Sequence, residues 1–306
     1  MYYPILRGKL NELLALRELA ILGLPKHFCP VIEPVREDFS GLRKTITELN
    51  NNNIEPIVIV NPLKGDFKGQ FINITDSLNH NSNLKYLPCF ILHDRVEGIP
   101  AEISKLSRYA LFVTRGVDSQ VIIDSEKAEL TFINHDISPN IIKKIKNVVL
   151  CGDFFKRQSK NADYPEESSF SSLHTYYNEL GAVGFSDYTI TGEEFSESGG
   201  PAYVVTIHLS YIDSERFEEM FIRHYSSYSD GTPAQPGAKF LDALKKLIAD
   251  ISSEKISFVK TSALQEFVTL NNPPPHFPGL GQVKKISIKH HIETLVDYLS
   301  NKPKVE

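Results

Sequence analysis

Short apolar runs recur along the first two thirds of the chain, and polar stretches separate them. A short, nearly continuous apolar run is typical of a strand that is covered on both faces, as in a parallel sheet. The runs predict nine strands, one more than an eight-stranded barrel uses. The predicted strands are residues 3–6, 29–32, 56–60, 88–92, 110–114, 121–123, 148–151, 182–185 and 203–207.

Most of the segments between these runs have the periodicity of helices. In residues 10–22 the leucines at positions 10, 13 and 14 lie apart from the charged side chains, and Gly23 follows as a stop signal. Residues 41–49 and 137–145 are also predicted to be helical. An alternation of strands and helices favours parallel pairing with right-handed crossovers. The pattern therefore predicts an α/β fold with a (β/α)8 TIM-barrel-like domain.

Two of the predicted strands, 110–114 and 121–123, lie too close together for a helical crossover. One of them is therefore expected to be a hairpin arm or an irregular insertion. A further apolar run at 129–133 leaves the order of the elements open in this region.

After residue 212 the alternation gives way to helices and coil. Amphipathic helices are expected at 240–251 and 288–299, and a further helix at 214–224. We predict two parts, a barrel domain at residues 1–225 and a C-terminal helical extension at residues 226–306 that packs on the barrel.

Composition and charge narrow the class of protein. The chain is 41% hydrophobic and 23% charged and has no apolar run of membrane-spanning length, so a globular protein without a membrane segment is expected. The beginning of the chain shows no secretion signal, so a cytoplasmic location is expected. A net charge of −5 argues against a broadly basic surface, and binding of nucleic acid is the least favoured class.

The three cysteines, Cys29, Cys89 and Cys151, each fall in a predicted strand. We expect reduced core residues there, because a free cysteine behaves as a small apolar side chain. A nucleophilic role is the less favoured alternative, since no cysteine has a histidine close in sequence.

Three segments resemble a known family. The segments YYPILRGKLNELLALREL, CPVIEPV and KKISIKHHIETLVDYL resemble the start, the second strand and the final helix of the uncharacterised bacterial and phage "beta protein" family. The resemblance implies a β/α-barrel-like protein of phages and mobile bacterial loci that has no established activity. It also implies a role in phage–host conflict, such as anti-phage defence, in a complex with a protein encoded by a neighbouring gene. Residues 50–145 carry no signature of the family.

Polar residues follow most of the predicted strands. In a β/α barrel the active site lies at the carboxyl ends of the strands, so these side chains are expected to converge on one mouth. The strand ends supply Arg7, Lys9, Glu33, Arg36, Asn61, Lys64, His93, Asp94, Arg115, Asp124, Asp153, Asp187 and His208.

This set of residue types suggests a role for each class of side chain. Carboxylates are ligands for Mg²⁺ or Mn²⁺, and arginine and lysine bind phosphate oxygens. Histidine serves as a general acid or base near neutral pH. We assign metal binding to Glu33, Asp94 and Asp124, phosphate binding to Arg7, Lys9 and Arg115, and catalysis to Asp153, Asp187, His93 and His208.

Each of these residues also has a structural interpretation. Strands of any α/β protein end at the surface in polar residues, and an aspartate there often caps a helix. His290 and His291 are adjacent and cannot bind one metal as an i, i+4 pair would, so His291 is expected to be a packed core histidine. The segment GLGQ at 279–282 follows prolines instead of a strand and is not a phosphate-binding loop.

Two functions of different classes remain open. The first is a metal-assisted hydrolase or phosphodiesterase that acts on a phosphorylated small molecule or nucleotide. The second is a barrel scaffold without chemistry of its own that binds a partner protein. The polar segments 159–172 and 194–200, expected to be loops over the barrel mouth, fit either one.

Overall fold

The computed structural model describes residues 1–24, 27–70, 72–80, 83–93, 103, 106–197 and 199–301. The chain divides into two compact units, each made of two segments. The first unit is Met1–Asp153 with Tyr176–Tyr188, and the second is Phe154–Thr175 with Thr189–Glu306. The boundary predicted between residues 225 and 226 does not coincide with this division.

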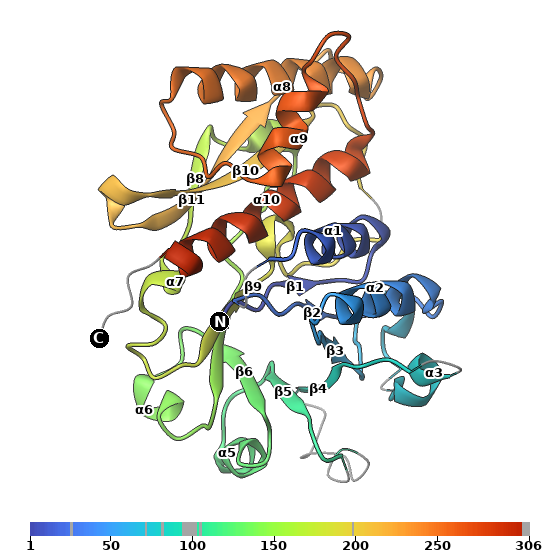
Figure 1. Ribbon diagram of the computed structural model, residues 1–306, viewed down its shortest axis with the longest axis vertical. Helices are drawn as coiled ribbons and strands as arrows, with labels where there is room; N and C mark the ends of the chain where they lie inside the picture. The colour runs from blue at the N-terminus through green and yellow to red at the C-terminus, as the bar shows by residue number, and fades with distance from the viewer. Residues whose placement is uncertain are drawn as a thin grey trace. The chain divides into compact units, whose positions relative to one another are not determined.

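The first unit is built on eight parallel strands in the order β1-β2-β3-β4-β5-β6-β7-β9 (Figure 1). Each strand pairs with the next through a register of matched residues, for example Ile59 of β3 with Cys89 of β4. The strands are β1 (Ile5–Leu6), β2 (Val31–Ile32), β3 (Ile57–Ile59), β4 (Leu87–Leu92), β5 (Ala110–Val113), β6 (Leu130–Asn134), β7 (Val148–Gly152) and β9 (Gly184–Asp187).

The last strand returns to the beginning of the chain and closes the barrel. Tyr2, just before β1, forms parallel bridges to both Phe28 and Phe185. The Tyr3 amide donates to the Phe185 carbonyl over 2.9 Å. Gly184 permits this approach, because a Cβ at that position would lie 2.5 Å from the Tyr3 ring. The predicted (β/α)8 TIM-barrel-like fold is therefore confirmed.

Apolar side chains fill the inside of the barrel. They come from alternate positions along each strand, such as Ile57 and Ile59 of β3 and Leu87, Cys89 and Ile91 of β4. This is the period of two that strands impose on their side chains. The interior is a packed core, so a ligand can reach the barrel only at its ends.

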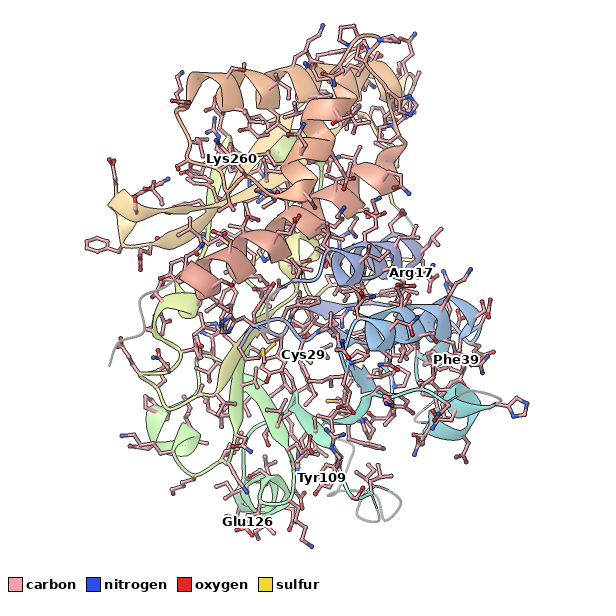
Figure 2. The ribbon with its side chains drawn as sticks, in the orientation of Figure 1. Arg17, Cys29, Phe39, Tyr109, Glu126 and Lys260 are labelled. Carbon is pink, nitrogen blue, oxygen red and sulfur yellow. The ribbon has the colours of Figure 1, made fainter. Side chains whose placement is uncertain are left out.

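Helices follow most of the strands. Arg17 of α1 joins it to α2 by donating to the Thr45 hydroxyl over 2.9 Å and to the Gly41 carbonyl over 3.1 Å, and Figure 2 labels this residue. Among the described residues, the helices of this unit are α1 (Leu10–Ile21), α2 (Ser40–Asn51), α3 (Thr75–Asn79), α5 (Ser119–Ser125) and α6 (Pro139–Ile142), with the 3-10 turn η1 (Gly65–Phe67).

The strand predicted at 121–123 is wrong. These residues lie in α5, which connects β5 to β6 and begins where the Asp118 side chain accepts a hydrogen bond from the Val121 amide over 2.9 Å. The apolar run at 129–133 supplies the sixth strand instead. The short helix explains why two strands so close in sequence can still be parallel.

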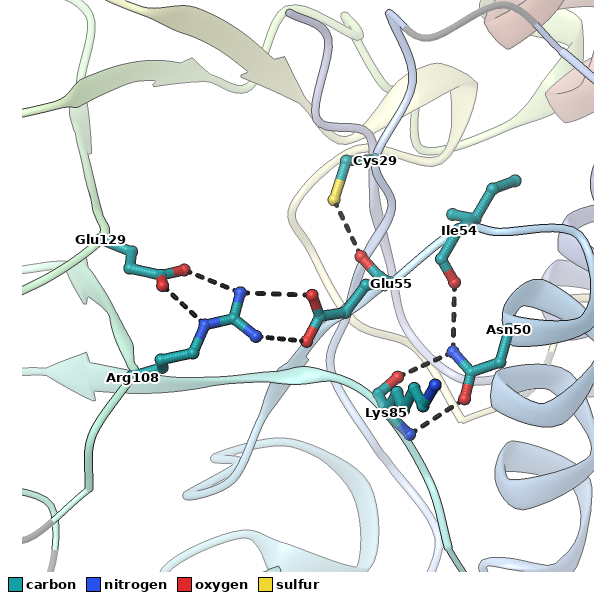
Figure 3. Close-up of polar contacts among 7 residues, drawn as sticks. All are labelled: Cys29, Asn50, Ile54, Glu55, Lys85, Arg108 and Glu129. Atoms are coloured by element: carbon teal, nitrogen blue, oxygen red, sulfur yellow. Dashed lines mark hydrogen bonds and ion pairs between the residues drawn. The ribbon is translucent and has the colours of Figure 1, made fainter.

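The amino ends of the strands are tied together by polar contacts (Figure 3). Arg108 donates to Glu55 over 2.9 and 3.2 Å and to Glu129 over 2.6 and 3.1 Å. The Asn50 side chain donates to the Lys85 carbonyl over 2.8 Å and accepts from the Lys85 amide over 2.9 Å. These contacts join segments that precede β3, β4, β5 and β6, so this end of the barrel serves stability.

The second unit contains a three-stranded antiparallel sheet in the order β10-β11-β8. Helices α8 and α9 and the first turns of α10 form a common apolar core with β10 and β11. The strands are β8 (Glu167–Ser171), β10 (Thr206–Asp213) and β11 (Glu219–Ser226). The helices are α8 (Pro236–Ser253), α9 (Ser262–Leu270) and α10 (Leu280–Asn301). The 3-10 turns are η2 (Asn161–Asp163), η3 (Thr189–Thr191) and η4 (Ser214–Arg216). The short helix α7 (Leu173–Tyr176) crosses from this unit to the first.

The helices predicted at 240–251 and 288–299 are confirmed. The strand predicted at 203–207 overlaps the start of β10, which belongs to the antiparallel sheet and not to the barrel. Two other predictions for this unit are wrong. Residues 214–224 form a turn and most of β11, and the expected loop at 159–172 contains β8. No described helix is both long and apolar enough to span a membrane.

Candidate functional site

A layer of polar side chains lies on the apolar core at the carboxyl ends of the barrel strands. The last core residue of each of the first seven strands faces inward, so the residue two positions further on faces inward as well. We call these residues the mouth layer. Its members are Arg7, Glu33, Asn61, His93, Thr114, Asn134 and Asp153.

One half of the mouth layer is buried and held by hydrogen bonds. Arg7 and Glu33 form an ion pair and are only 6% and 2% exposed. The second carboxylate oxygen of Glu33 accepts from the Leu63 amide over 3.2 Å. The Arg7 guanidinium also lies 4.8 Å from the centre of the Tyr188 ring. Arg7 and Glu33 are therefore fixed before any ligand binds.

The turn after β1 places Arg7 in this position. Gly8 adopts a left-handed φ of 56°, and a Cβ there would lie 3.2 Å from the Glu33 carbonyl oxygen. The Arg7 amide donates to the Glu12 carboxylate over 2.5 Å, which ties the strand to the first turn of α1. Lys9 is the residue before that helix and lies beyond the turn, outside the mouth layer.

Asn61 extends the pairing of β3 with β4 by means of its side chain. Its amide nitrogen donates to the Ile91 carbonyl over 2.9 Å, and its oxygen accepts from the Ile91 amide over 2.8 Å. Both polar atoms thus have backbone partners. Asn61 is a structural member of the layer.

The other half of the mouth layer is more exposed to solvent. His93, at the end of β4, is half-buried with its Nε2 shielded from solvent, and Asp153, at the end of β7, is exposed. Thr114 and Asn134, between them in strand order, are exposed too. A ligand arriving from solvent would meet this half first, with the Arg7–Glu33 pair as its neighbour in the same layer.

Two of the expected site residues lie next to the mouth layer but point elsewhere. Asp187 ends β9 on the face opposite to Ser186, whose hydroxyl donates to the Tyr3 carbonyl over 2.6 Å. It is 2% exposed and accepts from the Tyr2 hydroxyl over 2.8 Å. Burial first, and then the charge of Asp187, raises the pKa of Tyr2. Arg115 follows the inward-facing Thr114 and is paired with Asp118 at 3.4 Å.

Two further assignments do not lie at the mouth of the barrel, and a third falls outside the described residues. Asp124 lies on α5 and accepts from Gln120 over 2.8 Å, so its placement at a strand end is corrected. His208 lies within β10 of the second unit, not at the end of a barrel strand. Asp94 lies outside the described residues.

The described part of the chain does not bring three histidine, cysteine, aspartate or glutamate side chains together as metal ligands. Of the expected ligands, Glu33 is paired with Arg7 and Asp124 lies on a helix. Glu33 and Asp124, the two expected ligands that the structure describes, therefore do not lie together. Asp153 is the exposed carboxylate of the mouth layer.

The cysteines are free thiols in the barrel. Cys89 and Cys151 are buried in its core, and Cys29 packs against that core from a partly buried position. Burial, followed by the charge of Glu55, raises the pKa of Cys29 to about 12, and burial also raises the pKa of Cys89. These two thiols are protonated at neutral pH, which agrees with the core interpretation.

Two members of the mouth layer, Thr114 and Asn134, were missed by reasoning from the sequence. Asn134 could not be found because the apolar run at 129–133, which leads into it, was not assigned as a strand. Thr114 could have been found by counting two positions on from the core residue Phe112.

Comparison of the chain with models of protein families, with curated proteins and with solved structures found no match. The resemblance to the "beta protein" family therefore stays a prediction from three segments.

Proposed function

We propose that the first unit is a hydrolase that acts on a small phosphorylated molecule, such as a phosphodiester or a nucleotide, at the carboxyl ends of its strands. One observation carries the proposal: a preformed buried Arg7–Glu33 pair lies in the same inward-facing layer as the half-buried His93 and the exposed Asp153. This layer is where a β/α barrel places its chemistry.

The charges of the layer favour a divalent cation as cofactor. Arg7 is neutralised by Glu33, so the accessible formal charge is that of Asp153. A phosphate 4 Å from that carboxylate would be repelled by about 1 kcal/mol per pair of unit charges even in water, and by more near the protein surface. Mg²⁺ or Mn²⁺ removes this repulsion when bound, and Mg²⁺ uses one or two carboxylates together with water and substrate phosphates. Asp153 would hold the cation.

The remaining members of the layer have separate tasks in this proposal. His93 donates a proton to the leaving oxygen, which is a common role of an imidazole near neutral pH. Arg7 offers guanidinium N–H donors whose position does not change during the reaction, since Glu33 and Tyr188 hold its guanidinium. The Thr114 hydroxyl, which donates to the Leu92 carbonyl over 3.2 Å, accepts a hydrogen bond from the substrate, and the side-chain NH₂ of Asn134 donates one.

Asp153→Asn is the central test. We expect it to lower the rate of Mg²⁺- or Mn²⁺-dependent hydrolysis of bis(4-nitrophenyl) phosphate or 4-nitrophenyl phosphate by about 100-fold or more, as for loss of a main catalytic group. The melting temperature should stay within about 2 °C, because an exposed side chain contributes little to stability.

Two other aspartates serve as matched controls. Asp124→Asn, on α5, should keep the wild-type rate. Asp187→Asn should lower the melting temperature, because Tyr2 loses a buried charged partner, and should keep the turnover of the folded fraction. Equal loss of rate in Asp124→Asn and Asp153→Asn would contradict the proposal, as would unfolding of the Asp153 variant.

Binding of a partner protein is a second candidate function. Phe217, at the turn between β10 and β11, is 93% exposed with a left-handed φ of 58°. An aromatic ring held in solvent at the tip of a hairpin supports a docking role. No turnover in the assay above, together with co-purification of the product of a neighbouring gene that Phe217→Ser abolishes, would favour this candidate.

A further inference from the structure

One polar side chain from each strand of the antiparallel sheet joins a chain of hydrogen bonds in the second unit. The Ser168 hydroxyl of β8 lies 2.8 Å from Nε2 of His224 on β11. Nδ1 of His224 lies 2.7 Å from Nδ1 of His208 on β10. The sequence separates these three residues by 56 and 16 positions, and only the pairing of the strands brings them together.

The register of the sheet places all three side chains on one face. His208 pairs directly with His224, and Ser168 pairs with Ile222, two positions from His224 on the same strand. The rings of Phe155 and Tyr164 lie 5.2 and 4.6 Å from the ring of His208, centre to centre. Tyr164 also stacks on His224 at 4.8 Å. Both imidazoles are thus held in place by aromatic contacts.

Both imidazoles are neutral at neutral pH. Burial, followed by the charges of His224 and Lys284, lowers the pKa of His208 to about 3. Burial and then Arg223 lower the pKa of His224 to about 4, against the opposing effect of Glu167. A contact between two neutral ring nitrogens contains one proton. When His224 donates it from Nδ1, Nε2 of His224 is left as an acceptor for the Ser168 hydroxyl.

We propose that Ser168 is a nucleophile for acyl transfer, with His224 as its general base and His208 as the residue that positions His224. A nucleophile in hydrogen-bond contact with a base, which is in turn oriented by a third group, is the arrangement that activates serine in unrelated hydrolases. The substrate class is a small carboxylic ester. This site lies in the second unit and does not depend on the function proposed for the barrel.

The backbone of β8 offers a donor for the developing oxyanion. The His224 amide donates to the Glu166 carbonyl over 2.9 Å, so the alternation of an antiparallel ladder turns the amides of residues 166 and 168 toward β11. The amide of Ser169, the residue after the nucleophile, is turned the other way, and β8 is an edge strand. Ser168 itself is partly exposed to solvent.

The reaction balances without a further reactant except water. The Ser168 oxygen attacks the carbonyl carbon while its proton moves to Nε2 of His224. The bond from carbon to the alcohol oxygen breaks, and the alcohol leaves with that proton. Water then attacks the acyl-serine through the same base, which releases the carboxylic acid and restores the Ser168 hydroxyl. Because the low pKa makes His224 a weak base, slow turnover is expected and covalent labelling is the better measurement.

The test is labelling of the full chain with a fluorophosphonate probe, followed by mass spectrometry of its peptides. We expect the label on Ser168 and its loss in Ser168→Ala. Ser210 is an internal control, because its hydroxyl lies 2.7 Å from Nδ1 of His291 but is fully buried, and it should stay unlabelled. Ser159→Ala, an exposed serine of the same unit, should be labelled at the wild-type rate.

The positioning role of His208 has its own measurement. His208→Leu should slow labelling by about 100-fold, and His208→Asn, whose amide can restore the acceptor, should recover most of that rate. Circular dichroism of each variant checks the fold. Labelling at another residue, no labelling of folded wild-type protein, or equal rates in wild type and folded His208→Leu would overturn the proposal.

Discussion

Arg7→Met is expected to lower the free energy of unfolding by about 3–5 kcal/mol, which is the usual cost of removing one partner of a buried ion pair. Glu33 is 2% exposed, and in this variant its carboxylate would lose its cation while remaining out of water. The ring of Tyr188 would also lose the guanidinium beside it. Urea-induced unfolding, followed by circular dichroism, measures the change.

Two further variants separate this effect from a general loss of charge. Arg36→Met breaks a pair with Asp66 at 2.9 Å in which both side chains are about one third exposed or more, and it should cost about 0–1 kcal/mol. The double variant Arg7→Met, Glu33→Leu should recover much of the loss, because no buried charge remains. An Arg7→Met variant as stable as Arg36→Met would show that the Glu33 carboxylate is not isolated from water.

The second unit is expected to become less stable as the pH falls below about 6.5. The cause is histidines that the fold buries in the neutral form, and His290 is the main example. Its Nε2 donates to the Ser210 carbonyl over 2.8 Å, and its Nδ1 accepts from the Thr261 hydroxyl over 2.7 Å. Burial lowers the pKa of His290 to about 4, even though the Ser210 carbonyl raises it. The folded state therefore keeps this imidazole neutral over a range in which the unfolded chain binds a proton.

The direction of this pH effect on stability follows from the number of protons that the folded and unfolded states bind. Between pH 6.5 and about 4 the unfolded state holds more protons, so the stability present above pH 6.5 is lost as the pH falls through this window. At pH 5 His290 alone accounts for about 2 kcal/mol. His208 and His224 act in the same direction, since their pKa values are lowered to about 3 and 4.

Unfolding in urea at pH 7.5 and pH 5 measures this loss. His290→Gln should show a smaller difference between the two pH values than the wild type, because it removes one of the groups that take up a proton on unfolding. An unchanged difference in His290→Gln would mean that other groups account for the acid sensitivity of this unit.

Local patterns predicted the barrel well, because a buried parallel strand is a short apolar run in any sequence. Seven of the barrel strands were expected near their actual positions, and the helices at 10–22 and 41–49 were expected for the same local reason. The missing strand, β6, lies beside the α5 segment, whose apolar residues imitate a strand. Only the cap formed by Asp118 marks that segment as a helix.

The second unit was harder to predict because its sheet pairs segments that are distant in the sequence. β8 is polar enough to pass for a loop, and its pairing with β11 joins residues 167–171 to residues 220–223. β11 is apolar on both faces, so its residues lack the alternation that would separate a strand from a helix.

The same holds for the candidate sites: residues marked by a local pattern could be predicted, and contacts between segments far apart in the sequence could not. Arg7, Glu33, His93 and Asp153 could be predicted, because each follows a strand whose end was visible in the sequence. The ion pair between Arg7 and Glu33 could not, since it depends on which side chains share the inner face. His208 was selected as a catalytic histidine, but at the end of a barrel strand instead of within β10. Ser168 and His224 were beyond reach, because Ser168 was expected in a loop and His224 in a helix.

Tungstate, which stands in for phosphate, tests the central claim most directly. Crystals of the full chain soaked in sodium tungstate with MgCl₂ would be measured at the tungsten absorption edge, so that anomalous density locates the anion. We predict a tungsten peak at the carboxyl ends of the barrel strands, beside His93 and Asp153. Saturating tungstate that leaves this mouth layer empty while it binds elsewhere on the protein would contradict the account.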